Sequence, residues 1–388
     1  MREYVMGECV IVERRHLQAL VDALGRHEFT VIAPTVRSKA VTYQEITSID
    51  ELPVGMIDEQ DAGVYRLKQG KREAVFDYTV GADSWKSYLH PPALKLFSAT
   101  RDQEDGFTLH EGEEETPRYA FFGVRACELN AIAIQDKVFL GGPHIDVHYK
   151  RRREETFIVG VNCGRATGTC FCVSMNTGPR VGPGYDLTLT EVIENGSHVF
   201  VTEIGSERGA AILAEIPHTP ADENRTEQAA AIVHQTAKNM GRRMETEGIK
   251  ELLYENLEHP RWDDVASRCL ACANCTMVCP TCFCTTVEDV TDLTGEHVDR
   301  WQKWDSCFTM DFSYIHGGSV RKSNKARYRQ WMTHKLATWI DQFDSSGCVG
   351  CGRCISWCPV GIDITIEVDA IRKTPKRSHV DDAEGETS

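Results

Sequence analysis

The stretch CLACANCTMVCPTCFC, residues 269–284, contains six cysteines in sixteen residues, and one of them, Cys279, is followed by proline. So many thiols in one short segment indicate a disulfide knot, a zinc site or an iron–sulfur cluster. The three alternatives differ in the cysteine spacing that they require and in the kind of protein that carries them.

The overall composition is that of a soluble protein of two or three domains. The chain has 388 residues, of which 41% are hydrophobic, and a formal net charge of −15. It contains no run of roughly 18 apolar residues that would span a membrane, and no secretory signal. We therefore expect a cytoplasmic protein, and the acidic balance argues against nucleic-acid binding. In a reducing compartment, the 16 cysteines favour metal binding over disulfides.

A four-cysteine motif occurs twice in the last third of the chain. The spacing Cys-x2-Cys-x2-Cys-x3-Cys-Pro is that of bacterial two-cluster ferredoxins. Zinc sites use paired C-x2-C units with a longer spacer between the pairs and fit this pattern poorly. The two copies are Cys269, Cys272, Cys275 and Cys279, and Cys348, Cys351, Cys354 and Cys358.

The ferredoxin spacing also predicts how the ligands are shared, because the fourth cysteine of each motif binds the other cluster. The first [4Fe–4S] cluster is therefore predicted to bind Cys269, Cys272, Cys275 and Cys358. The second is predicted to bind Cys348, Cys351, Cys354 and Cys279. Crossed ligation of this kind clamps together two segments that are far apart in the sequence.

Charge predicts a difference between the two clusters. Arg353 lies inside the second motif, whereas the matching position of the first motif is Asn274. A nearby cation favours the more negative, reduced cluster, so we predict the higher potential for the cluster held mainly by Cys348, Cys351 and Cys354. An EPR-monitored titration of Arg353→Asn tests this prediction. The alternative is that Arg353 is a surface side chain.

Four further cysteines lie in the first half of the chain. Cys127 and Cys163 each end an apolar run of strand length, and Cys170 and Cys172 follow in a loop rich in glycine and threonine. We predict a third [4Fe–4S] cluster on these four thiols, with Gly164, Gly168 and Gly178 allowing close backbone approach. The alternative is a set of buried thiols in a tight loop.

Cys282, Cys284 and Cys307 lie between the two motifs and have no evident fourth partner. They are either buried thiols or part of a further metal or redox site. Cys9 stands alone and has no predicted role. The stretch 321–335 is basic, and we interpret most of it as a solvated helix face, although it could also offset cluster charge or dock an acidic partner. Its basic residues are Arg321, Lys322, Lys325, Arg327, Arg329 and Lys335.

The hydrophobic patterns predict an α+β protein. A mixed α/β domain over residues 1–217 precedes a helical connection over 218–261 and a mostly helical, ferredoxin-like two-cluster domain over 262–372, and residues 373–388 are predicted to be disordered. Strands are expected at 119–127 and 155–163, a strand pair at 186–204, and a strand from 29 that stops at Pro34. Helices are expected at 14–27 and 323–343, and one that begins at Thr219-Pro220.

Motifs for other chemistry are missing from the sequence. No G-x-G-x-x-G follows a predicted strand and opens a helix, and no Walker A loop occurs. We therefore expect no NAD or flavin to be bound by this chain. A chain with clusters and no substrate chemistry of its own has the profile of an electron relay.

A longer order of motifs carries a family resemblance. The chain contains GVRAC, GVNCGRATGTCFC, SMNTGP, CLACANCTMVCPTCFC, WDSC, RYRQWMTHKL and CVGCGRCISWCPVGIDI, in that order. From about residue 5 to 372 it resembles the iron–sulfur beta subunits of cytoplasmic four-subunit [NiFe]-hydrogenases, or sulfhydrogenases. It is also similar to the A-type subunits of anaerobic sulfite reductases. Asn176, in SMNTGP, stands where this family is expected to have glycine.

The resemblance implies a non-catalytic electron-transfer subunit beside the hydrogenase small and large subunits and a flavin- and NAD(P)-binding gamma-type subunit. It carries over to the eight cysteines of the two motifs as cluster ligands. We therefore predict a relay of single electrons in a cytoplasmic NAD(P)-linked [NiFe]-hydrogenase. Three alternatives stay open: the corresponding component of a sulfite reductase, a sulfur or polysulfide reductase that uses Cys282, Cys284 and Cys307, and a structural zinc scaffold.

Overall fold

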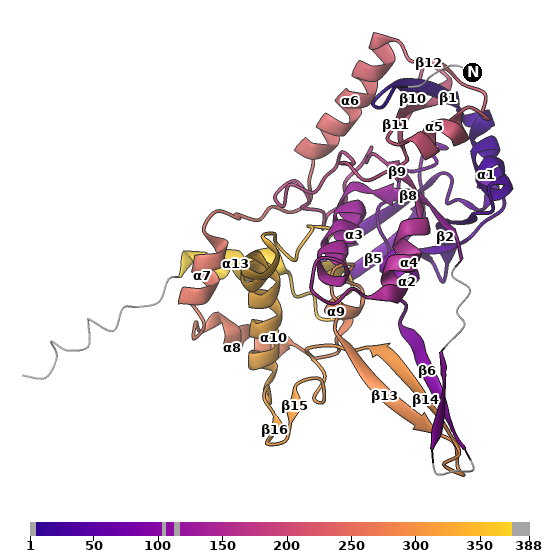
Figure 1. Ribbon diagram of the computed structural model, residues 1–388. Helices are drawn as coiled ribbons and strands as arrows, with labels where there is room; N and C mark the ends of the chain where they lie inside the picture. The colour runs from indigo at the N-terminus through magenta and orange to yellow at the C-terminus, as the bar shows by residue number, and fades with distance from the viewer. Residues whose placement is uncertain (1–4, 103–105, 112–116, 375–388) are drawn as a thin grey trace, which may run out of the picture.

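An eight-stranded mixed sheet is the largest element of the computed structural model, which describes residues 5–102, 106–111 and 117–374 (Figure 1). Its strands are β1 (Cys9–Glu13), β2 (Thr30–Arg37), β3 (Ala40–Glu45), β8 (Tyr119–Arg125), β9 (Phe157–Val161), β10 (Leu187–Glu194), β11 (Ser197–Ile204) and β12 (Thr219–Pro220). They lie in the order β12–β1–β11–β10–β9–β8–β2–β3. The neighbours β10, β9, β8 and β2 are parallel, and the outer strands are antiparallel to their neighbours.

Helices cover both faces of this sheet because its central strands are apolar on both sides. Along β8, Ala120 and Phe122 belong to one buried apolar cluster and Phe121 belongs to another. The first cluster includes α1 (Leu17–Arg26) and α5 (Glu207–Leu213), and the second includes α2 (Lys86–Leu89), α3 (Ala126–Phe139) and α4 (Val147–Glu155). The remaining helical segments of this part are η1 (Arg14–His16), η2 (Ile49–Glu51) and α6 (Glu223–Lys238).

Two predicted boundaries in this part are wrong. β2 continues through Pro34, because its pairing with β8 ends at Ile32 and the missing N–H of proline removes no bond to that strand. Thr219 and Pro220 pair with β1 instead of starting a helix. α6 begins after Asp222, whose carboxylate accepts a hydrogen bond from the backbone N–H of Arg225 at 2.8 Å. The predicted strands at 119–127, 155–163 and 186–204 and the helix at 14–27 are confirmed apart from their ends.

The C-terminal part consists mainly of short helices. They are α7 (Ile249–Glu255), α8 (Arg261–Arg268), α9 (Asn274–Met277), α10 (Asn324–Thr333), η3 (His334–Thr338), α11 (Trp339–Phe343), α12 (Arg353–Ser356) and α13 (Ile364–Lys373). α10, η3 and α11 form one continuous helical run, which confirms the helix predicted over 323–343, and η3 is a π-helical turn within it.

A four-stranded sheet joins the two parts and projects away from both (Figure 1). It combines β6 (Ala93–Arg101) and β7 (Phe107–Glu111) with β13 (Thr285–Thr291) and β14 (His297–Trp304). β14 pairs antiparallel with β6, so a hairpin from the predicted cluster region completes a sheet that begins in the first part. The smaller hairpins are β4 (Met56–Asp61) with β5 (Val64–Gln69), and β15 (Tyr314–Ile315) with β16 (Gly318–Ser319).

The predicted α+β class is confirmed, with the large sheet in the N-terminal part and short helices around the cysteine motifs. No helix in the described ranges is long and apolar enough to cross a membrane. Most of the tail predicted to be disordered, residues 375–388, lies outside the described residues.

Candidate iron–sulfur centres

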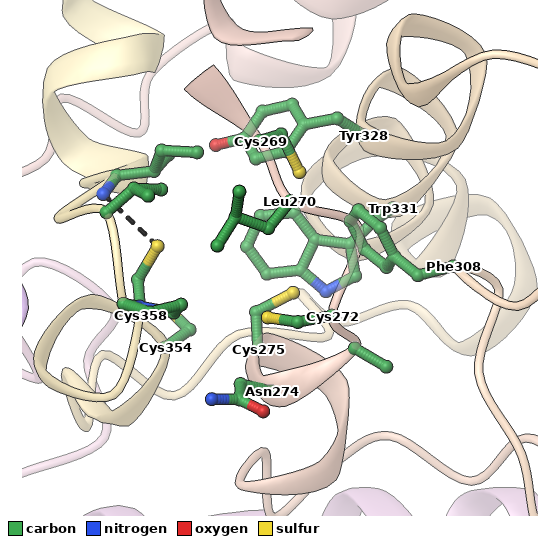
Figure 2. Close-up of a pocket in the computed structure, with 14 residues that line it drawn as sticks. Cys269, Leu270, Cys272, Asn274, Cys275, Phe308, Tyr328, Trp331, Cys354 and Cys358 are labelled. Carbon is green, nitrogen blue, oxygen red and sulfur yellow. Dashed lines mark hydrogen bonds between the residues drawn. The ribbon is translucent and has the colours of Figure 1, made fainter. Parts of the chain in front are cut away.

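The four cysteines assigned to the first cluster line one pocket. Cys269 and Cys272 come from the segment that leads into α9, Cys275 lies within α9, and Cys358 comes from the turn that follows α12. Figure 2 shows their sulfurs around a shared space. Apolar side chains complete the lining: Leu270, Phe308, Tyr328, Trp331, Val360 and Ile362.

Backbone geometry positions these thiols. Ala271 and Ala273 have φ values of 50° and 65°, in the left-handed region that lets the chain turn sharply. The backbone N–H of Ala271 donates to Cys269 Sγ at 3.4 Å, and the N–H of Ile362 donates to Cys358 Sγ at 3.3 Å. Amide donors of this kind stabilise negative charge on cysteine sulfur.

The second group gathers around α12. Cys348 and Cys351 lie on the loop before this helix, and Cys354 lies within it. Burial raises the pKa of Cys348 to about 12 against the opposing effect of Lys335, and charges on Cys351 and Cys279 raise this pKa further. Burial raises the pKa of both Cys351 and Cys354, and charge on Cys279 raises each of them further. Cys279 therefore lies near the cysteines of the second motif, and Cys358 lies near those of the first. This exchange is what crossed ligation requires.

The third group forms where two parallel strands end. β8 and β9 are neighbours, so their carboxyl ends meet at one edge of the sheet. Cys127 lies in the first turn of α3 rather than at the end of a strand, and Cys163 follows β9. Burial raises the pKa of Cys172, and charges on Cys163 and Cys170 raise it further. Burial also raises the pKa of Cys127, and Cys351 and Cys172 add to this shift.

The three groups are adjacent in space. Cys354, assigned to the second group, also lines the pocket of the first. Cys127 and Cys172 pack in one apolar cluster that Cys351 of the second group joins. The second group therefore lies between the other two.

A close backbone contact fixes the second group against the third. The N–H of Phe171 donates to the carbonyl of Gly350 at 2.9 Å. Gly350 has a φ of +64°, and a Cβ atom there would lie 2.7 Å from the backbone of Cys172. Asn176, where glycine is expected, has a φ of 56°, a conformation that asparagine tolerates better than most residues.

Within the described residues, no three His, Cys, Asp or Glu side chains converge as ligands of a single metal ion. A [4Fe–4S] cluster distributes its four thiolates over four irons, so its ligands lie farther apart than those of one zinc ion. The donor set of each group, four cysteines with mostly buried or half-buried side chains, fits such a cluster.

The remaining cysteines have different surroundings. Cys282, Cys284 and Cys307 line one small pocket, which His334 and Lys335 also line. This pocket provides an imidazole beside the three thiols, a neighbour that the sequence did not reveal. Cys9 lies in β1 on the large sheet, and its thiol donates to the carbonyl of Gly7 at 3.9 Å.

Arg353 is fully buried, so the alternative of a surface side chain is wrong. Its side chain is 0% exposed and lies 2.5 Å from Glu128 Oε1. It also donates to the carbonyls of Gly81 and Asp83 at 3.0 and 2.8 Å. The charge of Arg353 is therefore paired with a carboxylate next to Cys127.

The basic stretch is only partly a solvated face. Lys322 is exposed, but Arg327 and Lys335 are buried. Arg327 donates to the carbonyl of Phe308 at 3.0 Å. Lys335 lies four residues from Trp331 and from Trp339, both buried, and this helical spacing was the signal that it faces inward.

Comparison with known proteins agrees with this geometry. Residues 268–362 match the family described as 4Fe-4S dicluster domain, a match that supports [4Fe–4S] clusters in the region of the two motifs. The chain is also 28% identical over 346 residues to the beta subunit of sulfhydrogenase 2 from Pyrococcus furiosus, a match that covers 88% of this chain and 92% of that protein. The resemblance noted in the sequence is confirmed, and these matches support an iron–sulfur electron-transfer subunit.

Proposed function

We propose that the chain relays single electrons through three [4Fe–4S] clusters. Cys269, Cys272, Cys275 and Cys358 would hold the first cluster, Cys348, Cys351, Cys354 and Cys279 the second, and Cys127, Cys163, Cys170 and Cys172 the third. When bound, a cluster of this type accepts and gives up one electron at a time. The protein's part is to hold the cysteines, exclude water and set the order of the centres.

The adjacency of the three groups is the observation that carries this proposal. Cys354 shares a pocket with the first group, and Cys351 packs with Cys127 and Cys172 of the third. Such a line, with the second group in the middle, suits the transfer of electrons between the first and the third cluster. Cys272 is exposed, so the first group reaches the surface and offers an end to a partner.

The partners are also part of the proposal. The relative's name describes a hydrogenase subunit, which supports a complex with [NiFe]-hydrogenase small and large subunits and a flavin- and NAD(P)-binding gamma-type subunit. The A-type component of an anaerobic sulfite reductase is the alternative in the same class. Activity assays on the purified native complex distinguish the two alternatives. A hydrogenase complex predicts hydrogen-dependent NAD(P) reduction, and a sulfite reductase complex predicts sulfite reduction.

Iron and acid-labile sulfide per chain test the number of clusters in anaerobically purified protein. Three clusters predict about twelve of each and two predict about eight. Cys172→Ser should lower the iron content by about four, whereas Cys9→Ser, which alters a thiol of β1 that belongs to none of the three groups, should leave it unchanged. Eight irons in the unaltered protein, with no loss in Cys172→Ser, would show that the third group consists of thiols alone.

A second candidate function rests on the pocket of Cys282, Cys284 and Cys307. Three thiols beside the buried ammonium of Lys335 suit a redox site for sulfur or polysulfide. Reduction of polysulfide by the chain with reduced viologen, abolished in Cys282→Ser, would support this function. Absence of this activity leaves the relay as the function of the chain.

A further inference from the structure

Lys335 is a buried cation at the second group. It lies in η3, the π-helical turn between α10 and α11, and only 4% of the residue is exposed. Its Nζ donates to Cys279 Sγ at 3.3 Å, to Thr281 Oγ1 at 3.1 Å and to the carbonyl of Gly347 at 3.2 Å. Cys282 Sγ lies 3.6 Å away. The ammonium therefore bridges the segments that carry the two motifs.

The charge of Lys335 differs from that of Arg353 in how it is balanced. The partners of Lys335 Nζ are two sulfurs, a hydroxyl and a carbonyl, none of which is a carboxylate. Arg353, the cation singled out from the sequence, is paired with Glu128 at 2.5 Å, and both side chains are buried. A carboxylate this close cancels most of the field of the guanidinium beyond the pair. Lys335 therefore places at Cys279 a positive charge that none of its hydrogen-bond partners balances.

We propose that Lys335 is the positioning residue that makes the second cluster the easiest of the three to reduce. This inference rests on the proposed function, in particular on Cys279 as a ligand of that cluster. An ammonium that donates to a ligand sulfur stabilises the additional negative charge of the reduced state. Burial strengthens the effect, because neither water nor salt screens the ammonium.

The physical consequence concerns the middle of the line. A higher potential at the second cluster would make it the cluster that holds the electron during transfer between the first and third clusters. The chain would then hold an electron away from the exposed end at Cys272 until a partner at either end can accept it.

The test is an EPR-monitored redox titration of the full chain with Lys335→Met. The midpoint of one cluster should fall by at least ~59 mV, which is a tenfold change for a one-electron couple, while the others move much less. Lys335→Arg keeps the charge and should retain the higher midpoint. Lys322→Met removes an exposed lysine of the same basic stretch and should change nothing.

Iron analysis on the same samples separates the possible failures. Full iron content with unchanged midpoints in Lys335→Met would overturn the role of Lys335 and leave the relay intact. Loss of about four irons in both Lys335 variants would also overturn it, because the residue would then serve cluster retention. Unaltered protein without [4Fe–4S] signals would instead reject the proposed function.

Discussion

Arg353 and Glu128 form a fully buried ion pair at 2.5 Å, with side chains that are 0% and 1% exposed. The pair joins the second cysteine motif to the first turn of α3, beside Cys127. Glu128 also accepts hydrogen bonds from the hydroxyl of Tyr43 at 2.7 Å and from the indole of Trp85 at 3.1 Å. A single carboxylate thus connects the cluster motif with the large sheet and the helices on one of its faces.

Removal of this carboxylate should destabilise the protein strongly. Glu128→Gln leaves the guanidinium of Arg353 buried without a counter-charge, which costs about 3–5 kcal/mol. Thermal unfolding of the anaerobic protein measures the loss.

The double variant Glu128→Gln, Arg353→Met provides the control. It removes both charges and should recover part of the lost stability, because no isolated charge remains buried. If the loss of stability in the double variant equals the sum of the losses in Glu128→Gln and Arg353→Met alone, the interaction between the two side chains contributes nothing.

Arg353→Asn should move the cluster potentials less than Lys335→Met does, since Glu128 already balances the charge of the arginine.

Crossed ligation makes a prediction that local ligation does not. Cys358→Ser should alter the EPR signal of the cluster held by Cys269, Cys272 and Cys275, although residue 358 lies in the second motif. Cys279→Ser should alter the signal of the other cluster. If each serine variant instead changes the cluster of its own motif, the exchange of fourth ligands is wrong.

The sequence could predict which cysteines lie near one another because the determinants of that proximity are local. The first three cysteines of each motif lie within a short stretch of the sequence. The carboxyl ends of β8 and β9 meet because the two strands are parallel neighbours. The environment of the groups could not be predicted in the same way. Arg353 and Glu128 are 225 residues apart, and no periodicity relates one to the other.

The four-stranded sheet could not be predicted for a related reason. β13 and β14 mix charged and apolar residues on both faces, so neither shows the alternation of a half-buried strand, and their place in a sheet is evident only from the pairing of β14 with β6. Lys335 closes a run of basic residues, a pattern that favours a solvated face, and only its spacing from Trp331 and Trp339 indicates an inward position. Its burial depends on a pocket that Cys279, Thr281 and Gly347 form, and these residues lie on two separate segments of the chain.

Gly350 should not tolerate a side chain. Its left-handed φ of +64° costs an alanine about 1–2 kcal/mol, and a Cβ atom would meet the backbone of Cys172 at 2.7 Å. Gly350→Ala should therefore lower the unfolding temperature and weaken magnetic coupling between the second and third clusters in EPR spectra. Gly182→Ala is the matched control, since no atom lies within 4 Å of the added Cβ. Equal behaviour of the two variants would argue against a close contact between the groups.

His90 gives the protein a stability that depends on pH. Its ring is buried between Phe139 and Trp304, at centroid distances of 4.8 and 6.2 Å. Burial, reinforced by the charge of Lys86 and opposed by that of Asp146, lowers the pKa of His90 to about 4. The unfolded chain has an imidazole pKa of about 6.5, so it binds the proton first. The contribution is complete above pH 6.5 and is lost as the pH falls from there toward 4.

At pH 5 the loss from His90 should be about 2 kcal/mol relative to pH 7. Thermal unfolding at both pH values, in the unaltered protein and in His90→Phe, measures it. The aromatic replacement keeps the packing between Phe139 and Trp304 but cannot bind a proton. The pH-dependent decrease should therefore be smaller in the variant by about that amount, whatever the clusters contribute to both proteins. An equal decrease in the two proteins would mean that the imidazole of His90 has the same pKa in the folded protein as in the unfolded chain.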